Sequence, residues 1–273
     1  KSTLLRLLYS RLGDAAALMP QDSALADGGF VVGFLAATGS SSYEVRQVIY
    51  DAAGAMVGAE QLVSATDVEH TVHPGASVAG LFGAGGTDAG HVTVWTADGP
   101  DGDGQGVFFQ RYDAAGAVAG GATQVNTSTL LDQFGAKVVG LSGGGFAIAW
   151  LSDDNLDTVT GVYARLYDAS GAAQGDAFLV NPVFGQASYD LDMSATADGG
   201  FSVDAADGGA STLAVGALGD SGGSANGEAR CTVRLQGSRT AARSLAARCS
   251  ATVGRLGQQR VHHCNPDGAR LTL

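Results

Sequence analysis

The chain has 273 residues, of which 45% are hydrophobic, 15% are charged and 42 are glycine. This hydrophobic content excludes wholesale disorder, and the absence of any run of 18 uncharged apolar residues predicts no membrane-spanning helix. The net charge is −12, and residues 1–229 alone carry seven basic and 26 acidic side chains, a net charge of −19. Such an acidic body argues against nucleic acid or an anionic membrane as its partner.

Residues 1–16 are predicted as a separate N-terminal segment. Their beginning, KSTLLRLL from Lys1 onward, resembles the end of the phosphate-binding loop of ABC-transporter ATPases, in which the lysine contacts phosphates and the next hydroxyl binds magnesium. The sequence contains neither the glycine-rich half of that loop nor a Walker-B aspartate. The alternative is an amphipathic helix with Leu4, Leu5 and Leu8 on one face.

One pattern recurs along the chain: an apolar segment, a variable loop, a second segment that ends in Tyr, and then Asp-x-x-Gly. The separation from Asp51 to Asp113 is 62 residues, and that from Asp113 to Asp168 is 55 residues. A period of this size is typical of repeat architectures, in which neighbouring units complete one another's core. The apolar segments are GGFVVGF at 28–34, GHVTVW at 90–95, GGFAIAW at 144–150 and GGFSVDA at 199–205.

Each unit is predicted to hold four short antiparallel strands, because its alternating segments are separated by glycine-rich and Asp-x-x-Gly turns. The predicted units are 24–81, 82–141 and 142–196, with a partial fourth unit from 197. Four strands in about fifty residues are typical of one blade of a β-propeller. The fold prediction over 17–205 is therefore all-β: tandem four-stranded antiparallel units in a partial β-propeller-like array, with irregular terminal segments.

Two sets of recurring residues are predicted to have structural roles. Phe34, Trp95 and Trp150 fall at equivalent positions, and we expect them to fill the space between successive sheets. The recurring aspartate indicates a turn requirement, since paired glycosidase carboxylates would instead be two specific acids at one cleft. No GxSxG nucleophile elbow is predicted, because Ser142 and the glycines after it fall in an inter-strand turn of the repeat. No HExxH motif occurs, and no catalytic residue is predicted.

The complete pattern of GGFxVxW, an Asp-Gly-rich loop, GVYAxxYDAxG and a closing VN resembles the repeats of large secreted bacterial proteins. These proteins are associated with calcium-binding repeats-in-toxin (RTX) tracts and type I secretion. The resemblance covers residues 24–205 and implies an extracellular or cell-surface module used in adhesion or as a scaffold. The second unit departs from the pattern, since it lacks Gly-Gly-Phe and carries an additional LFGAGGTDAG stretch.

The Asp-rich loop of the second unit is the candidate metal site. Closely spaced carboxylates with glycines allow oxygens to converge on calcium, which takes roughly six to eight of them. The alternative is a solvated polar turn, because the loop lacks a trailing bidentate glutamate. The candidate calcium ligands are Asp98, Asp101 and Asp103 in this loop, and Asp153 and Asp157 in the equivalent loop of the third unit.

A second group of metal-type residues lies at His70 and His73 beside Glu69. Their spacing suits zinc, but Pro74 and the lack of a nearby cysteine favour surface histidines. The residue types of a zinc site also occur in the C-terminal tail, without a recognised spacing, at Cys249, His262, His263 and Cys264.

The composition changes after the repeats. Residues 206–229 are predicted as a Gly/Ser-rich linker, and residues 230–273 hold all three cysteines and eight arginines against one acidic residue. This tail is either a functional basic segment, with a basic helix at 243–255, or the product of a different reading frame.

The sequence thus predicts a non-catalytic extracellular module that binds a glycan or protein surface ligand through loops on one face, with calcium as a candidate stabilising ion. The alternatives are a propeller-type carbohydrate-active enzyme and, more remotely, a fragment of an ABC-type ATPase.

Overall fold

The computed structural model describes residues 17–38, 43–64, 76–153, 160–180, 188–196, 199–207, 212–214, 230–236 and 247–250. Regular structure in these residues is β-strand, apart from one 3₁₀ turn at Ala84–Gly86 in the inserted stretch of the second unit. No helix in this described part of the chain is long and apolar enough to span a membrane.

Three four-stranded antiparallel sheets follow one another along the chain, and each is a simple meander. A two-stranded sheet and a three-stranded sheet come after them. Sheet A comprises β1 (Ala17–Ala24), β2 (Phe30–Ala37), β3 (Tyr43–Tyr50) and β4 (Met56–Ser64). Sheet B comprises β5 (Ala76–Phe82), β6 (Asp88–Asp98), β7 (Gln105–Tyr112) and β8 (Thr123–Gln124), and sheet C comprises β9 (Gln133–Gly140), β10 (Phe146–Ser152), β11 (Gly161–Tyr167) and β12 (Phe178–Leu179). Sheet D holds β13 (Ser188–Ala195) and β14 (Phe201–Asp207), and the last sheet holds β15 (Thr212–Ala214), β16 (Arg230–Gln236) and β17 (Ala247–Ser250).

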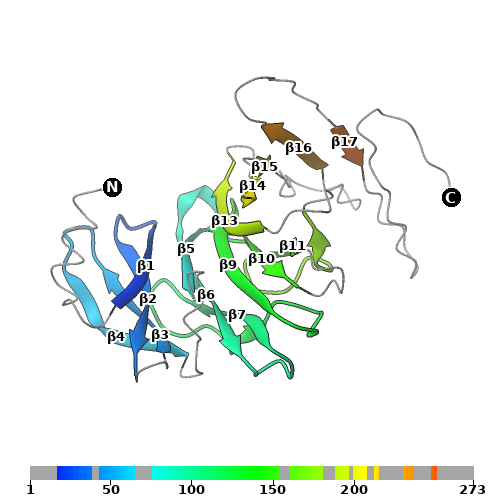
Figure 1. The fold of residues 1–273 in the computed structure, drawn as a ribbon. Helices are drawn as coiled ribbons and strands as arrows, with labels where there is room; N and C mark the ends of the chain where they lie inside the picture. Colours follow the sequence, from blue (N-terminus) through cyan, green and yellow to red (C-terminus); the bar gives the residue numbers. More distant parts are fainter. Residues whose placement is uncertain are drawn as a thin grey trace.

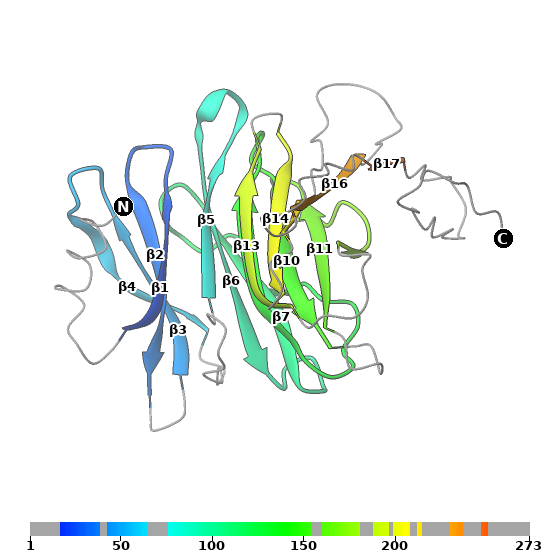
Figure 2. The same cartoon turned by 45° about the horizontal axis from the view of Figure 1, so that its top comes forward.

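The first strands of sheets A to D lie next to one another, with β5 between β1 and β9, and β9 between β5 and β13 (Figure 1). The remaining strands of each sheet lead away from this inner row, and neighbouring sheets pack face to face (Figure 2). This is the arrangement of successive blades in a β-propeller. The predicted fold class, an all-β, partial β-propeller-like array of four-stranded antiparallel units, is confirmed.

The sheets begin one strand earlier than the units predicted from sequence. Segment 76–81 was expected to end the first unit, but as part of β5 it pairs with β6, where Gly80 lies opposite His91. Within segment 136–141, residues 137–140 likewise pair with β10 as part of β9. The reason is the tight turn before each apolar segment: the amide of Leu141 donates to the carbonyl of Gly145, which joins β9 and β10 as a hairpin. The predicted unit limits therefore each cross from one sheet into the next.

The recurring aspartates close the turns after β3, β7 and β11. Asp51 Oδ1 accepts hydrogen bonds from the amides of Ala53 and Ala55 at 2.9 and 2.8 Å, and the same pair of bonds recurs at Asp113 and Asp168. The turn glycines have φ values of 75° to 85°, which L-residues rarely adopt. The prediction of a turn role for these aspartates is confirmed.

An aromatic pair recurs at the hairpin end of each of sheets A to C. Phe30 stacks on Tyr50 and Phe146 stacks on Tyr167, both with ring centroids 4.9 Å apart. In sheet B the phenylalanine position is taken by His91, which stacks on Tyr112 at 4.6 Å. The second unit therefore lacks the Gly-Gly-Phe sequence but keeps a ring stacked on the tyrosine.

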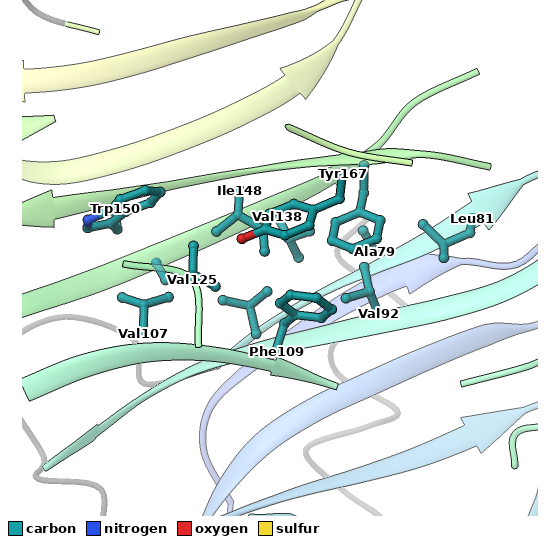
Figure 3. Packing of buried hydrophobic residues seen from close by; sticks show 13 residues of the cluster. Ala79, Leu81, Val92, Val107, Phe109, Val125, Val138, Ile148, Trp150 and Tyr167 are labelled. Atoms are coloured by element: carbon teal, nitrogen blue, oxygen red, sulfur yellow. The ribbon is translucent and has the colours of Figure 1, made fainter. Parts of the chain in front are cut away.

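Two of the three expected aromatic wedges lie between sheets. Trp95 of sheet B packs with Leu35 and Val45 of sheet A. Trp150 of sheet C belongs to the cluster that joins sheets B and C, together with Val107, Phe109, Ile148 and Tyr167 (Figure 3). Phe34 differs, because the residues of its cluster all come from sheet A.

The terminal predictions have mixed outcomes. Residues 1–16 lie outside the described residues. The helix expected over 243–255 is wrong at 247–250, which form β17 and pair with β16. Strands β14 and β15 also extend into the region expected to be a linker.

The close approach of the inner strands predicts a strict requirement for glycine. A Cβ on Gly140 would lie 2.2 Å from the carbonyl oxygen of Gly80, so we expect Gly140→Ala to lower the free energy of unfolding by about 1–3 kcal/mol. Gly121 has open space around it and serves as the control, with an expected change for Gly121→Ala within about 0.5 kcal/mol. Urea unfolding of both variants tests this requirement, and equal midpoints would contradict it.

Candidate functional site

The two ends of the sheets differ in construction. Because consecutive antiparallel strands alternate in direction, the hairpin turns and the Asp-x-x-Gly turns lie at the same end of each of sheets A to C. The opposite end, here called the loop end, carries the loops after β2, β6 and β10 and the connections between sheets. These loops vary in sequence from sheet to sheet, whereas the turns at the other end repeat. The loop end is therefore the part of the fold where a site can be built without disturbing the repeat.

The Asp-rich loop of sheet B is tied to the connection that leads into sheet C. Asp101 Oδ2 accepts a hydrogen bond from Asn126 Nδ2 at 2.9 Å, and Asp103 Oδ2 accepts one from the amide of Leu131 at 3.2 Å. In the other direction, Asp132 Oδ1 accepts a hydrogen bond from the amide of Gln105 at 2.9 Å. Three carboxylates thus hold two segments together.

Asn126 and Gln133 form the buried centre of this arrangement. Asn126 Oδ1 accepts a hydrogen bond from the amide of Val107, and its Nδ2 lies 2.7 Å from Gln133 Oε1. Gln133 Nε2 donates to the carbonyl groups of Leu130 and Leu131 at 2.8 and 3.2 Å. Neither residue was predicted as part of a site. The sequence signal was the Val-Asn pair that closes the repeat. In sheet B the amide of Val125 donates to the carbonyl of Val107, and the equivalent bond in sheet C runs from the amide of Val180 to the carbonyl of Val162.

The candidate calcium ligands divide into separate structural roles. Asp101 and Asp103 lie in the same loop, whereas Asp98 is the last residue of β6 and lies opposite Gln105. Asp153 accepts a hydrogen bond from the hydroxyl of Thr160 at 2.7 Å, and its amide donates to the carbonyl of Asp132. Asp157 lies outside the described residues. Among the residues that are described, no group of three or more His, Cys, Asp or Glu side chains is placed to hold a metal ion.

One carboxylate oxygen in the cluster is left over. Asp101 Oδ1 is buried and has no hydrogen-bond partner, while Oδ2 of the same residue bonds Asn126. A cation would satisfy such an oxygen, but calcium needs roughly six to eight donors. Most of the neighbouring carboxylate contacts already serve backbone amides. The described residues therefore supply one free oxygen, Asp101 Oδ1, which is far short of a calcium ligand set, and calcium remains a prediction from loop composition.

The turn around Asp168, one of the recurring aspartates, favours the ionised form of its carboxyl group. A hydrogen bond donated by the Ser170 hydroxyl is the main cause that lowers the pKa of Asp168. A carboxyl group whose pKa lies below its usual value stays ionised at neutral pH and accepts hydrogen bonds from the turn.

The other candidate groups fall largely outside the described residues. Glu69, His70 and His73 do so, as do Lys1 and the residues that follow it. In the tail, backbone register places Cys231 opposite Cys249 across β16 and β17, while His262, His263 and Cys264 are not described.

Removal of the central asparagine tests whether this cluster holds the loop end together. We expect Asn126→Ala to lower the free energy of unfolding by about 2 kcal/mol or more, because the Val107 amide and the Gln133 side chain lose buried partners. Thr127→Ala, at an exposed neighbouring position, is the control and should change it by less than about 0.5 kcal/mol. Thermal and urea unfolding measure both, and an Asn126→Ala variant as stable as the control would refute this role.

No family model and no curated protein matches the chain. Three solved structures are similar to it at low identity. An endo-arabinase from Bacteroides thetaiotaomicron VPI-5482 aligns with 68% of this chain and 68% of its own, with 11% identity and a TM-score of 0.42. The Hadza microbial sialidase Hz136 aligns with 74% of this chain and 44% of its own, with 11% identity and a TM-score of 0.48. A protein of unknown function from Dyadobacter fermentans DSM 18053 aligns with 81% of this chain and 75% of its own, with 13% identity and a TM-score of 0.49.

Proposed function

We propose that the chain is a non-catalytic repeat module that binds a glycan or protein surface through its loop end and acts outside the cell in adhesion or as a scaffold. The supporting observation is the use of the acidic side chains. Those in the repeated turns and those in the Asp-rich loop accept hydrogen bonds from backbone amides or from Asn126. Side chains committed to holding loops support a rigid display surface.

Part of the loop end exposes apolar side chains in a constrained backbone. Leu130 and Leu131 are 46% and 42% exposed, and Leu131 has a φ of 58°, which is unusual for a residue other than glycine. Asp103 and Gln133 hold this conformation by hydrogen bonds to the Leu131 amide and carbonyl. Backbone strain of this kind is retained where the surroundings enforce it, and it occurs often at ligand-binding positions.

The charge of the body limits the class of ligand. With a net charge of −19 over residues 1–229, electrostatic repulsion disfavours polyanions such as nucleic acid. A neutral glycan or a protein surface without excess negative charge meets no such penalty. The extracellular setting rests on the resemblance of the repeats to secreted bacterial proteins.

Binding through the loop end predicts a position-dependent effect of surface substitutions. We expect Leu130→Ser to weaken binding at least fivefold for a glycan or protein ligand that the parent chain binds, because the substitution removes exposed apolar area at the proposed contact. Ala114→Ser, an exposed change in the turn at the opposite end of sheet B, should leave binding unchanged. A glycan array, followed by calorimetry on the ligand it identifies, measures both variants.

The same ligands distinguish the module from an enzyme. Release of reducing sugar from a polysaccharide panel, abolished by Asp101→Asn or Asp103→Asn, would contradict a non-catalytic role and support a propeller-type carbohydrate-active enzyme. Equal loss of binding in the Leu130→Ser and Ala114→Ser variants would count against the loop end as the contact surface.

Calcium stabilisation is a separate part of the proposal. If calcium binds at Asp101, a calcium concentration of about 100 times its Kd should add about 2.7 kcal/mol to the free energy of unfolding. Asp101→Asn keeps a hydrogen-bond acceptor for Asn126 but removes the charge, so its melting temperature should not respond to calcium. Scanning calorimetry in calcium and in EDTA measures this response, and an unresponsive parent chain would end the calcium proposal while leaving the binding role intact.

A further inference from the structure

The interface between sheets A and B is here called the A–B seam, and the interface between sheets B and C the B–C seam. The buried residues of the A–B seam are more polar than those at equivalent positions of the B–C seam. Three equivalent positions differ in chemistry. His91 takes the place of Phe146, Thr93 that of Ile148, and Gln47 that of Phe109.

The apolar seam is held by aromatic packing. Phe109 of sheet B contacts Phe146 and Tyr167 of sheet C edge-on, with centroid distances of 5.3 and 4.9 Å. Ile148 and Trp150 complete this cluster (Figure 3). Neutral and acidic conditions leave such contacts unchanged, because these side chains do not ionise below pH 7.

The polar seam is held partly by a chain of hydrogen bonds. The Thr93 hydroxyl donates to Gln47 Oε1 at 2.6 Å, and Gln47 Nε2 donates to Gln61 Oε1 at 2.8 Å. Gln61 Nε2 in turn donates to the carbonyl of Gly116 at 3.1 Å. These bonds link sheet A to sheet B but replace the hydrophobic burial that the other seam obtains from Phe109 and Ile148.

His91 is the titratable member of this seam. It is 1% exposed, stacks on Tyr112, and its Nε2 is buried without a hydrogen-bond partner. Burial lowers the pKa of His91 to about 4, an effect that the negative charge of Asp113 partly opposes. The histidine is therefore neutral while the seam is closed, and it gains a proton far more readily when water reaches it.

Among the described residues, Asp113 is the charged group that shifts the pKa of His91. On the sheet that carries His91, Asp88 accepts a hydrogen bond from the amide of Gly90, and Asp113 directly follows β7. Burial raises the pKa of Tyr112 to about 12, so its hydroxyl stays neutral. Strands β2 and β5 carry no ionisable side chain. On β3, Glu44 and Arg46 alternate with Gln47, so they lie on the face of sheet A that is turned away from His91.

We infer that the A–B seam is an acid-sensitive joint, which opens when His91 is protonated while the B–C seam stays closed. An open seam exposes His91 to water, where its proton affinity is ordinary. Between pH 6.5 and 4 the open state binds the proton and the closed state does not, so acidification favours opening. With the pKa rising from about 4 to 6.5 on opening, the opening constant should increase about 30-fold between pH 8 and pH 5.

The two tryptophans of the chain report the two seams separately. Trp95 lies in the A–B seam and Trp150 in the B–C seam. A Trp150→Phe variant therefore isolates the A–B signal, and a Trp95→Phe variant isolates the B–C signal. Acrylamide quenching and the emission maximum are measured from pH 8 to pH 4.5, with circular dichroism as the check of folding at neutral pH.

We expect Trp95 to become more quenchable and to shift its emission to longer wavelength on acidification, while Trp150 does not change over the same range. His91→Phe, which installs the residue found at this position in sheets A, C and D, should abolish the Trp95 response. His91→Leu is the second variant if the larger ring prevents folding. A Trp95 response that persists in both variants, or a simultaneous response of Trp95 and Trp150, would overturn the inference.

Discussion

The close approach of neighbouring inner strands is the constraint on which this array depends. A Cβ on Gly80 would lie 2.1 Å from the carbonyl oxygen of Ala24, and a Cβ on Gly140 would lie 2.2 Å from that of Gly80. The sheets can therefore pack at a common inner row only because these positions carry no side chain. Outside that row, where the sheets separate, Trp95 and Trp150 fill the wider space. Small residues inside and large ones outside give each sheet the shape of a blade.

The acidic residues of the body are used mainly as hydrogen-bond acceptors. At one end of the sheets, a single aspartate per turn satisfies two backbone amides. At the loop end, Asp101, Asp103 and Asp132 join segments that are far apart in sequence. A composition rich in Asp and Gly thus follows from turn geometry in this fold, and acidity alone does not specify a metal or catalytic site.

The seams between sheets need not be equivalent even though the sheets are. The B–C seam relies on aromatic burial around Phe109, and the A–B seam relies in part on hydrogen bonds of Gln47. Burial of polar groups contributes less net stability than burial of apolar groups of the same size, since hydration is lost when the seam forms. The repeat therefore fixes the geometry of stacking, while the identity of a few buried residues sets how firmly each pair of sheets is joined.

Four strands per repeat, the Asp turns and the positions of Trp95 and Trp150 followed from the sequence, because period-2 alternation and turn chemistry are local properties. The sequence did not show which strand begins each sheet. A strand has the same alternating sequence pattern whether it pairs with the strand before it or with the strand after it. Asn126 and Gln133 were missed for a similar reason, since their partners lie on other segments and meet only after sheets B and C pack. The alignment of the apolar segments already pairs His91 with Phe146, but strand register was needed to show that each lies opposite a tyrosine. Sequence by itself determined the repeating unit of four strands. Tertiary packing decided which strands share a sheet, which carboxylates find partners and which seam is polar. These contacts join residues that are far apart along the chain, so no local pattern specifies them.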